Sequence, residues 1–196
     1  MFEKLIRSYG NLKLKKESEQ VTRERTDPNI HKAAMIGILY DATEKETFEQ
    51  VKEFYRDLKN SGKDPVSPGF IDGTDVTFHP LARPESDYLF KTQVNWYEKP
   101  GSPVVENFID EPFDILINLT LADNYPLDFI AAVSKAGLKI GRANSAVSFC
   151  YDITFLVDPE SDLKTFAYMI IHYLSNINNA RTTSNKRHRS SHYHSV

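Results

Sequence analysis

The segment FDILINLTLADNYPLDFIAAVSKAGLKIGRAN, Phe113 to Asn144, decides the fold of this chain. Its apolar run from Phe113 to Leu121 predicts a buried strand. Pro126 at the start of the next element and Gly137 just past its end are typical of a helix. A second, short strand is expected from Leu138 to Ala143. The segment therefore predicts a βαβ unit, in which a helix joins two parallel strands.

Strands and helices alternate in the same way on both sides of this segment. Residues 33–41, AAMIGILYD, form an apolar run that predicts another buried strand. Thr43 and Glu46 have the spacing of a capping box, which predicts the start of a helix, and Gly62 predicts its end. The same patterns predict a strand over 152–157 and a helix over 162–177.

This alternation predicts the fold class. We expect an α/β protein with a three-layer sandwich, in which helices cover a Rossmann-like, mostly parallel sheet of about five strands. Residues 33–177 would form a single domain. An amphipathic basic helix would precede it within residues 1–25, and a disordered basic tail would follow over 178–196. An Asp72-Gly73 turn between alternating apolar residues, Phe70, Val76 and Phe78, further predicts a strand and hairpin.

Charge is distributed unevenly along the chain. The net charge is −3, with 24 Lys and Arg against 27 Asp and Glu. Residues 1–25 carry seven basic and four acidic residues, or +3, and residues 178–196 carry four basic and no acidic residues, or +4. The remaining 13 basic and 23 acidic residues give the body −10. We expect the body to repel nucleic acid and anionic membranes, which only the two ends could attract.

Several features favour a cytoplasmic location. No stretch approaches the roughly 18 apolar residues of a membrane span, and the charged N-terminus differs from a secretory signal. Cys150 is the only cysteine, which excludes an intramolecular disulfide and any cysteine-cluster metal site. Apolar neighbours predict that its thiol is buried and inert. We expect no metal site and no cofactor.

Four stretches of the chain look familiar: IGILYD (36–41), KTQVNWYEKP (91–100), the opening segment and LKTFAYMIIHYLSNIN (163–178). They resemble an uncharacterised family of Bacteroidetes proteins of about this length, a domain of unknown function. The resemblance implies a bacterial lineage and the cytoplasm, and it transfers no activity. A shorter likeness, Asp114–Leu119 leading to Ala136–Gly141, is similar to one half of heptosyltransferase-type glycosyltransferases and implies shared βαβ geometry.

Ligands of open α/β sheets bind beyond the carboxyl ends of the strands. Carboxylates that converge there could act as acid and base, and the catalytic candidates are Asp41, Asp72 and Asp123. Each also has a structural interpretation, as a residue of a turn or a helix start. The ligand-binding candidates are Asn118 and Thr120 at a strand end, Arg142 as a partner for a carboxylate, and Trp96 for stacking or for covering the core.

Phosphate-binding loops need glycines, so that backbone N–H groups can approach the anion. The two predicted βα loops, YDATEKETF and TLADNYPL, contain none. The sequence therefore argues against NAD, FAD and ATP.

The N-terminal helix is the strongest candidate for a partner site. Phe2, Leu5, Ile6 and Tyr9 follow helical spacing, and the lysines lie mostly off that stripe. We expect this stripe to bind a protein partner, to self-associate or to pack on its own domain. The preferred hypothesis is a non-catalytic binding or accessory module. The alternatives are a small-molecule enzyme acting on a sugar or nucleoside at the carboxyl edge, and association of the basic ends with a membrane or RNA.

Overall fold

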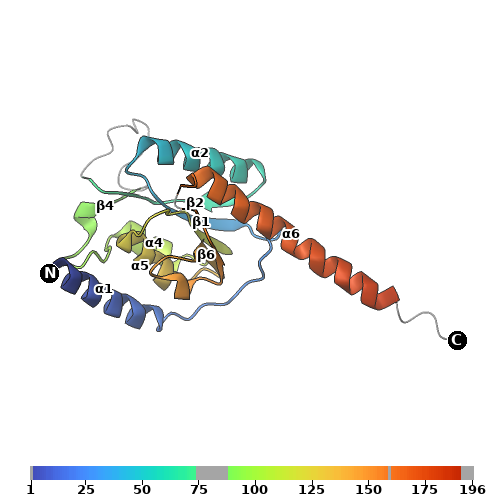
Figure 1. Ribbon diagram of the computed structural model, residues 1–196, viewed down its shortest axis with the longest axis horizontal. Coiled ribbons are helices and arrows are strands. Elements are labelled where there is room, and N and C mark those ends of the chain that lie inside the picture. The colour runs from blue at the N-terminus through green and yellow to red at the C-terminus, as the bar shows by residue number, and fades with distance from the viewer. Residues whose placement is uncertain (1, 74–87, 159, 191–196) are drawn as a thin grey trace.

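The computed structural model describes residues 2–73, 88–158 and 160–190, and for Glu3 and residues 178–190 we describe the backbone alone. Helices and strands alternate along almost all of this part of the chain (Figure 1). The elements are α1 (Phe2–Ser18), β1 (Met35–Asp41), α2 (Lys45–Asn60), β2 (Asp64–Val66), β3 (Gly69–Ile71), β4 (Tyr88–Phe90), the 3-10 helix η1 (Lys91–Gln93), α4 (Pro103–Asp110), β5 (Ile115–Asn118), α5 (Tyr125–Val133), β6 (Leu138–Arg142), the 3-10 helix η2 (Ser148–Cys150), β7 (Ile153–Phe155) and α6 (Leu163–Ser190).

The strands of the described residues form one seven-stranded sheet in the order β4-β3-β1-β5-β6-β7, with β2 also paired to β1. All pairings between these strands are parallel. β2 lies beside the first half of β1 and β3 beside its end, and Pro68 lies in the break between them. The predicted α/β fold class with its mostly parallel sheet is confirmed, and the sheet is larger than the five strands expected.

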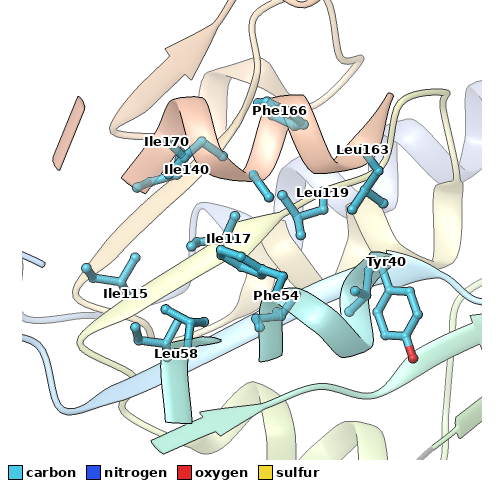
Figure 2. Close-up of a cluster of buried hydrophobic side chains, with 14 of the residues drawn as sticks. Tyr40, Phe54, Leu58, Ile115, Ile117, Leu119, Ile140, Leu163, Phe166 and Ile170 are labelled. Carbon is cyan, nitrogen blue, oxygen red and sulfur yellow. The ribbon is translucent and has the colours of Figure 1, made fainter. Parts of the chain in front are cut away.

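α2 and α6 cover one face of the sheet. Ile36, Ile38 and Tyr40 alternate along β1 with their side chains in this core, as period-two strand geometry requires. Phe54 of α2 and Phe166 of α6 are both fully buried against the sheet. Figure 2 shows both helices packing on the central part of the sheet. The side chains that they contact there are Ile115 and Ile117 of β5, Leu119 just after β5, and Ile140 of β6.

α4 and α5 cover the other face, and α1 lies outside α5 as a further layer (Figure 1). α5 is therefore enclosed, with the sheet on one side and Leu14 of α1 on the other. All nine of its residues are buried. This position explains why the helix in the opening segment is apolar around its whole circumference.

Two helix ends differ from the prediction. α5 ends at Val133, before the predicted stop at Gly137. Gly137 instead allows a close approach, since an added Cβ would lie 2.5 Å from the side chain of Thr26. The N-cap of α2 is Glu44, without a side-chain cap, and the Thr43 hydroxyl accepts a hydrogen bond from the backbone of Asp72. The end of α2 is as predicted, with Gly62 at φ 76° directly after the C-cap Ser61.

The last helix is longer than the sequence predicts. α6 continues to Ser190 and projects away from the body (Figure 1), whereas the predicted helix ends at Ile177 and a disordered tail follows. Residues 163–190 contain no proline or glycine, so no residue of that stretch breaks the helix. Residues 191–196 and the predicted hairpin around Val76 and Phe78 lie outside the described residues. α4, which the sequence analysis left unassigned, starts at the N-cap Ser102.

Candidate functional site

The carboxyl edge of the sheet contains the topological switch point between β1 and β5. The chain winds outward from β1 to β4 and then returns to β5 on the other side of β1. Asp41 ends β1 here, and its Oδ2 accepts a hydrogen bond from Nδ2 of Asn124 at 3.0 Å. Asn124 is also the N-cap of α5, because its Oδ1 accepts from the Leu127 backbone. The two loops that frame a ligand in many α/β proteins are thus linked by one side-chain contact.

This contact predicts a stability effect. We expect Asn124→Ala to lower the free energy of unfolding by about 1–2 kcal/mol, because the helix loses its cap and Asp41 loses a donor. Chemical denaturation would measure the change. Asn124→Ser, which keeps a capping oxygen but is too short to reach Asp41, should retain most of the stability. Unchanged stability in the alanine variant would contradict the structural role.

The other two catalytic candidates also have their own partners. Asp72 forms an exposed ion pair with Lys91, with 2.7 Å between Oδ1 and Nζ. Asp123 accepts a hydrogen bond from Arg142, with 2.9 Å between Oδ1 and the guanidinium. A catalytic role of Asp41, Asp72 or Asp123 stays a prediction, and these contacts give each of them a structural task.

Arg142, Asn118 and Thr120 form a polar layer at the end of β5 and β6. The buried guanidinium of Arg142 donates to the Thr120 carbonyl and to Oδ1 of Asn144, in addition to Asp123. Asn118 accepts from the backbone N–H and the hydroxyl of Thr120 and donates to the Tyr151 hydroxyl at 2.8 Å. Three of the four predicted ligand-binding residues, Asn118, Thr120 and Arg142, therefore lie close together and are joined by hydrogen bonds through Thr120.

Asp128 is a buried acid that the sequence analysis missed. It lies in α5 with its carboxylate 3.5 Å from the Ser145 hydroxyl. Burial, reinforced by the charge of Asp123, raises the pKa of Asp128 to about 7, although Arg142 and Arg7 oppose the shift. A single charged residue in the apolar stretch YPLDFIAAV was the signal available in the sequence.

The inner face of α1 packs on α5 at Gly10 and Leu14. Leu14 is buried, and the Gly10 carbonyl accepts a hydrogen bond of 2.6 Å from the Tyr125 hydroxyl. Ion pairs also bind the helix to the loop before α4, from Arg7 to Glu98 and from Glu17 to Lys99. α1 is thus fixed to its own domain by residues outside the predicted apolar stripe.

The predicted stripe faces outward for most of its length. Phe2, Leu5, Tyr9 and Leu12 are exposed, and only Ile6 of the predicted partner-binding residues is half-buried. Trp96, predicted as a ligand-binding residue, lies on this surface, where its ring stacks on Tyr9 with centroids 5.0 Å apart. We call this group the α1 surface; it consists of Phe2, Leu5, Tyr9, Leu12 and Trp96.

These apolar side chains are unusually open to solvent. The exposed fractions are 76% for Phe2, 65% for Leu5, 68% for Leu12 and 64% for Trp96. Their spacing of three and four residues places the helical members on one side of α1. Contiguous apolar groups of this kind mark interaction sites on protein surfaces.

The family of the chain is established by comparison with known proteins. A family model described as "Family of unknown function (DUF6913)" matches residues 4–177. The chain belongs to this family. The match includes most of α1, all strands of the described sheet and the first half of α6. Searches of curated proteins and of solved structures found no match.

This DUF6913 member lacks two further features in the part of the chain that the structure describes. Within residues 2–73, 88–158 and 160–190, no group of three or more His, Cys, Asp or Glu side chains could hold a metal ion. None of the helices in the described part of the chain has the length and apolarity to span a bilayer.

Proposed function

We propose that this protein is a non-catalytic binding module that docks a protein partner through the α1 surface. The observation that carries the proposal is the outward orientation of the apolar stripe on a helix that other residues already fix to the domain. Packing of α1 on its own domain uses Gly10 and Leu14, so the exposed side chains are available to a second molecule. This mode corresponds to an amphipathic helix that enters a groove of its partner.

The composition of the α1 surface favours a protein over other partners. Tryptophan and tyrosine are enriched among the residues that carry most of the energy of protein interfaces. Here Tyr9, Trp96 and Tyr97 pack against one another, with Tyr9 and Trp96 stacked and Tyr97 edge-on to both. Such mutual packing holds the rings in place before binding, which reduces the ordering cost of association.

Lysine side chains beside the apolar stripe indicate the charge of the partner. Lys13 lies beside the stripe, with its Nζ 5.6 Å from the centroid of the Tyr9 ring. Helical spacing places Lys16 near Tyr9 and Leu12 on the same side. We therefore infer an apolar groove with acidic side chains along its rim. The acidic body of the chain, at −10, would repel such a partner and so favour its approach to the basic N-terminal segment.

The carboxyl edge supports an enzyme on a sugar or nucleoside less well, because the candidate carboxylates and Arg142 are engaged with protein groups. We keep as proposals a cytoplasmic location and a Bacteroidetes origin. The heptosyltransferase-type likeness of residues 114–119 and 136–141 is explained by the β5-α5-β6 geometry that any βαβ unit shares.

The double variant Leu5→Glu/Leu12→Glu tests this function. We expect it to lose a protein that wild type retains from a lysate of the native cell, and to bind that purified protein at least roughly tenfold more weakly, since a buried anchor contributes about 2 kcal/mol or more. Both leucines are exposed, so thermal unfolding should change little. Leu156→Glu is the matched control, because Leu156 is also exposed but follows β7.

Each outcome of this experiment has a meaning. Loss of the protein from the double variant alone, together with weaker binding at high salt, supports the proposal. Retention of the same proteins by all three chains contradicts it. Binding of wild type to anionic vesicles without any protein would assign the surface to a membrane, and a dimer that the double variant lacks would assign it to self-association. Both of these results would overturn the proposed partner.

A further inference from the structure

A second feature, independent of the α1 surface, is an open pocket of about 240 Å³ between the end of α1, the segment after it, α5 and β6. Four of the residues that line it are basic and one is acidic. The basic residues are Lys15, Arg23, Arg25 and Lys139, and the acid is Glu19. Three of these basic residues belong to the N-terminal segment of net charge +3, and Lys139 adds a fourth from the acidic body.

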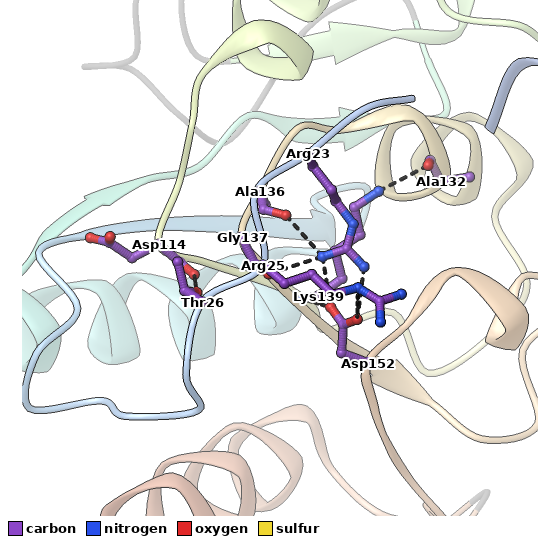
Figure 3. Close-up of polar contacts among 9 residues, drawn as sticks. All are labelled: Arg23, Arg25, Thr26, Asp114, Ala132, Ala136, Gly137, Lys139 and Asp152. Carbon is purple, nitrogen blue, oxygen red and sulfur yellow. Dashed lines mark hydrogen bonds and ion pairs between the residues drawn. The ribbon is translucent and has the colours of Figure 1, made fainter. Parts of the chain in front are cut away.

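One wall of the pocket is rigidly built around Arg23. Its guanidinium forms a two-point ion pair with Asp152, at 2.7 and 2.9 Å, and donates to the Ala136 and Gly137 carbonyls (Figure 3). Asp152 also accepts from the backbone N–H of Lys139 at 2.9 Å. These contacts join the segment after α1 to β6 and fix the position of the wall. The Arg23 guanidinium also neutralises the Asp152 carboxylate. Nε of Arg25 lies farther from that carboxylate, at 3.5 Å from Oδ1.

Lys139 brings a buried ammonium group to the same pocket. The residue is 2% exposed, and its Nζ donates to the Ala132 carbonyl at 2.9 Å (Figure 3). Burial, together with the charge of Arg23, lowers the pKa of Lys139 to about 8, while Cys150 and Asp152 oppose the shift. A neutral carbonyl compensates a buried charge only in part. An anion in the pocket would supply the missing negative charge.

The same pocket has an apolar side. Val21 and Phe149 line it, and the Phe149 ring is largely exposed. Cys150 lines it as a thiol, because burial raises its pKa to about 12 despite Lys139. Cys150 is half-buried, where the sequence predicts a buried and inert thiol, and the raised pKa keeps the thiol uncharged.

Backbone carbonyl groups at the end of α1 are engaged in hydrogen bonds within the chain. Carbonyl groups at a helix C-terminus repel negative charge. The Lys15 carbonyl, however, accepts from the Ser18 hydroxyl and the Glu19 backbone, and the Ser18 carbonyl accepts from Val21. The two lysines of the last turn, Lys15 and Lys16, further offset the helix dipole.

We propose that this pocket binds a small organic anion, a phosphate or carboxylate attached to an apolar or aromatic group. The anionic group would contact Lys139, Arg25 and Lys15, while Arg23 keeps the wall in place. The apolar group would lie on Phe149 and Val21. A pocket of this size fits a group comparable to a phenyl phosphate rather than a dinucleotide, which agrees with the absence of glycine from the βα loops.

Titration with three probes at constant ionic strength tests this site in the full-length protein. Phenyl phosphate carries both groups, inorganic phosphate only the anion and phenol only the ring. We expect phenyl phosphate to bind most tightly and to shift the NMR signals of residues 21–25, 139 and 149–150. Lys139→Met should weaken binding roughly tenfold, as expected for a charged hydrogen bond. Arg25→Ala, at an exposed side chain, should weaken it about threefold.

Arg56→Ala is the matched control, since it removes an exposed charge from α2, far along the chain from the pocket residues. We expect it to change binding by less than about twofold. Equal weakening by Arg56→Ala would show non-specific charge attraction and overturn the site. Absence of phenyl phosphate binding would overturn it as well, and so would binding of inorganic phosphate that is as tight. If Lys139→Met failed to fold, Arg25→Ala against Arg56→Ala would still decide the outcome.

Discussion

Gly10→Val is expected to detach α1 from α5 and to lower the free energy of unfolding by about 2–4 kcal/mol. A Cβ at this position would lie 2.9 Å from Oη and 3.0 Å from Cζ of Tyr125, which is too close for real atoms. Forcing a larger side chain into a packed contact costs about 1–3 kcal/mol. Loss of the Tyr125 hydrogen bond to the Gly10 carbonyl adds about 1 kcal/mol. Chemical denaturation and protease sensitivity of residues 19–25 would measure the effect.

Two matched variants isolate the cause. Gly101→Val places the same side chain where nothing lies within 4 Å, and we expect little change in stability. Tyr125→Phe removes the hydroxyl that lies nearest to the added Cβ, so that Gly10→Val should cost less in that background than in wild type. Equal stability of Gly10→Val and wild type would show that α1 is not fixed through this contact, and the α1 surface would lose its rigid support.

Gly10 also shows what sequence patterns predict for α1 and what they miss. Helical spacing correctly predicts the helix, and by composition glycine only weakens it. The pattern could not tell which of two apolar sides would face the domain, because that depends on the shape of α5. A glycine opposite a buried tyrosine allows a closer approach than a leucine, so Gly10 and Leu14 face inward while Phe2 and Leu5 face solvent.

The sheet was predictable for a different reason. Its central strands are buried on both faces, so they appear as continuous apolar runs with turn residues at their ends. The strands β2 and β4 contain three residues each, too few for a periodic pattern, whereas β3, also of three residues, lies at the strand predicted around Phe70. Thr43 and Gly137 have the residue types of helix ends, but tertiary contacts with Asp72 and Thr26 determine their positions.

Some residues of the candidate sites were predictable from the sequence, and others were not. Strand ends predict Asp41, Asn118 and Arg142 at one edge, and the structure places them there. Their partners Asn124 and Tyr151 come from elements whose positions depend on strand order, which the sequence does not contain. Lys139 was missed because a lysine inside a short strand is normally assigned to the solvent side. Here both faces of β6 are covered, and the buried Lys139 side chain lines a pocket.

Asp128→Asn is expected to stabilise the protein above neutral pH. The pKa of Asp128 rises from 3.8 to about 7 on folding, so between about pH 4 and 7 the folded chain holds a proton that the unfolded chain has released. Stability therefore falls as pH rises through this window, and the loss is complete above pH 7. About three pKa units at about 1.4 kcal/mol each give an upper value of about 4 kcal/mol.

The pH dependence separates this effect from ordinary repacking. Asparagine resembles the protonated carboxyl and does not titrate, so the advantage of the variant should be about a third of its full size at pH 5 and should reach its full size at pH 8. Unfolding free energies measured by denaturant at these two pH values would show it. Asp110→Asn, at an exposed carboxylate paired with Lys135, should change stability by less than about 1 kcal/mol and by a similar amount at both pH values.

A variant Asp128→Asn that is less stable than wild type at pH 8 would mean that the Asp128 carboxylate is favourable in the folded state. The attraction of Arg142 and Arg7 for the carboxylate would then exceed the cost of burying its charge. Asp128 would be a charged partner of these arginines in the folded protein rather than a protonated acid.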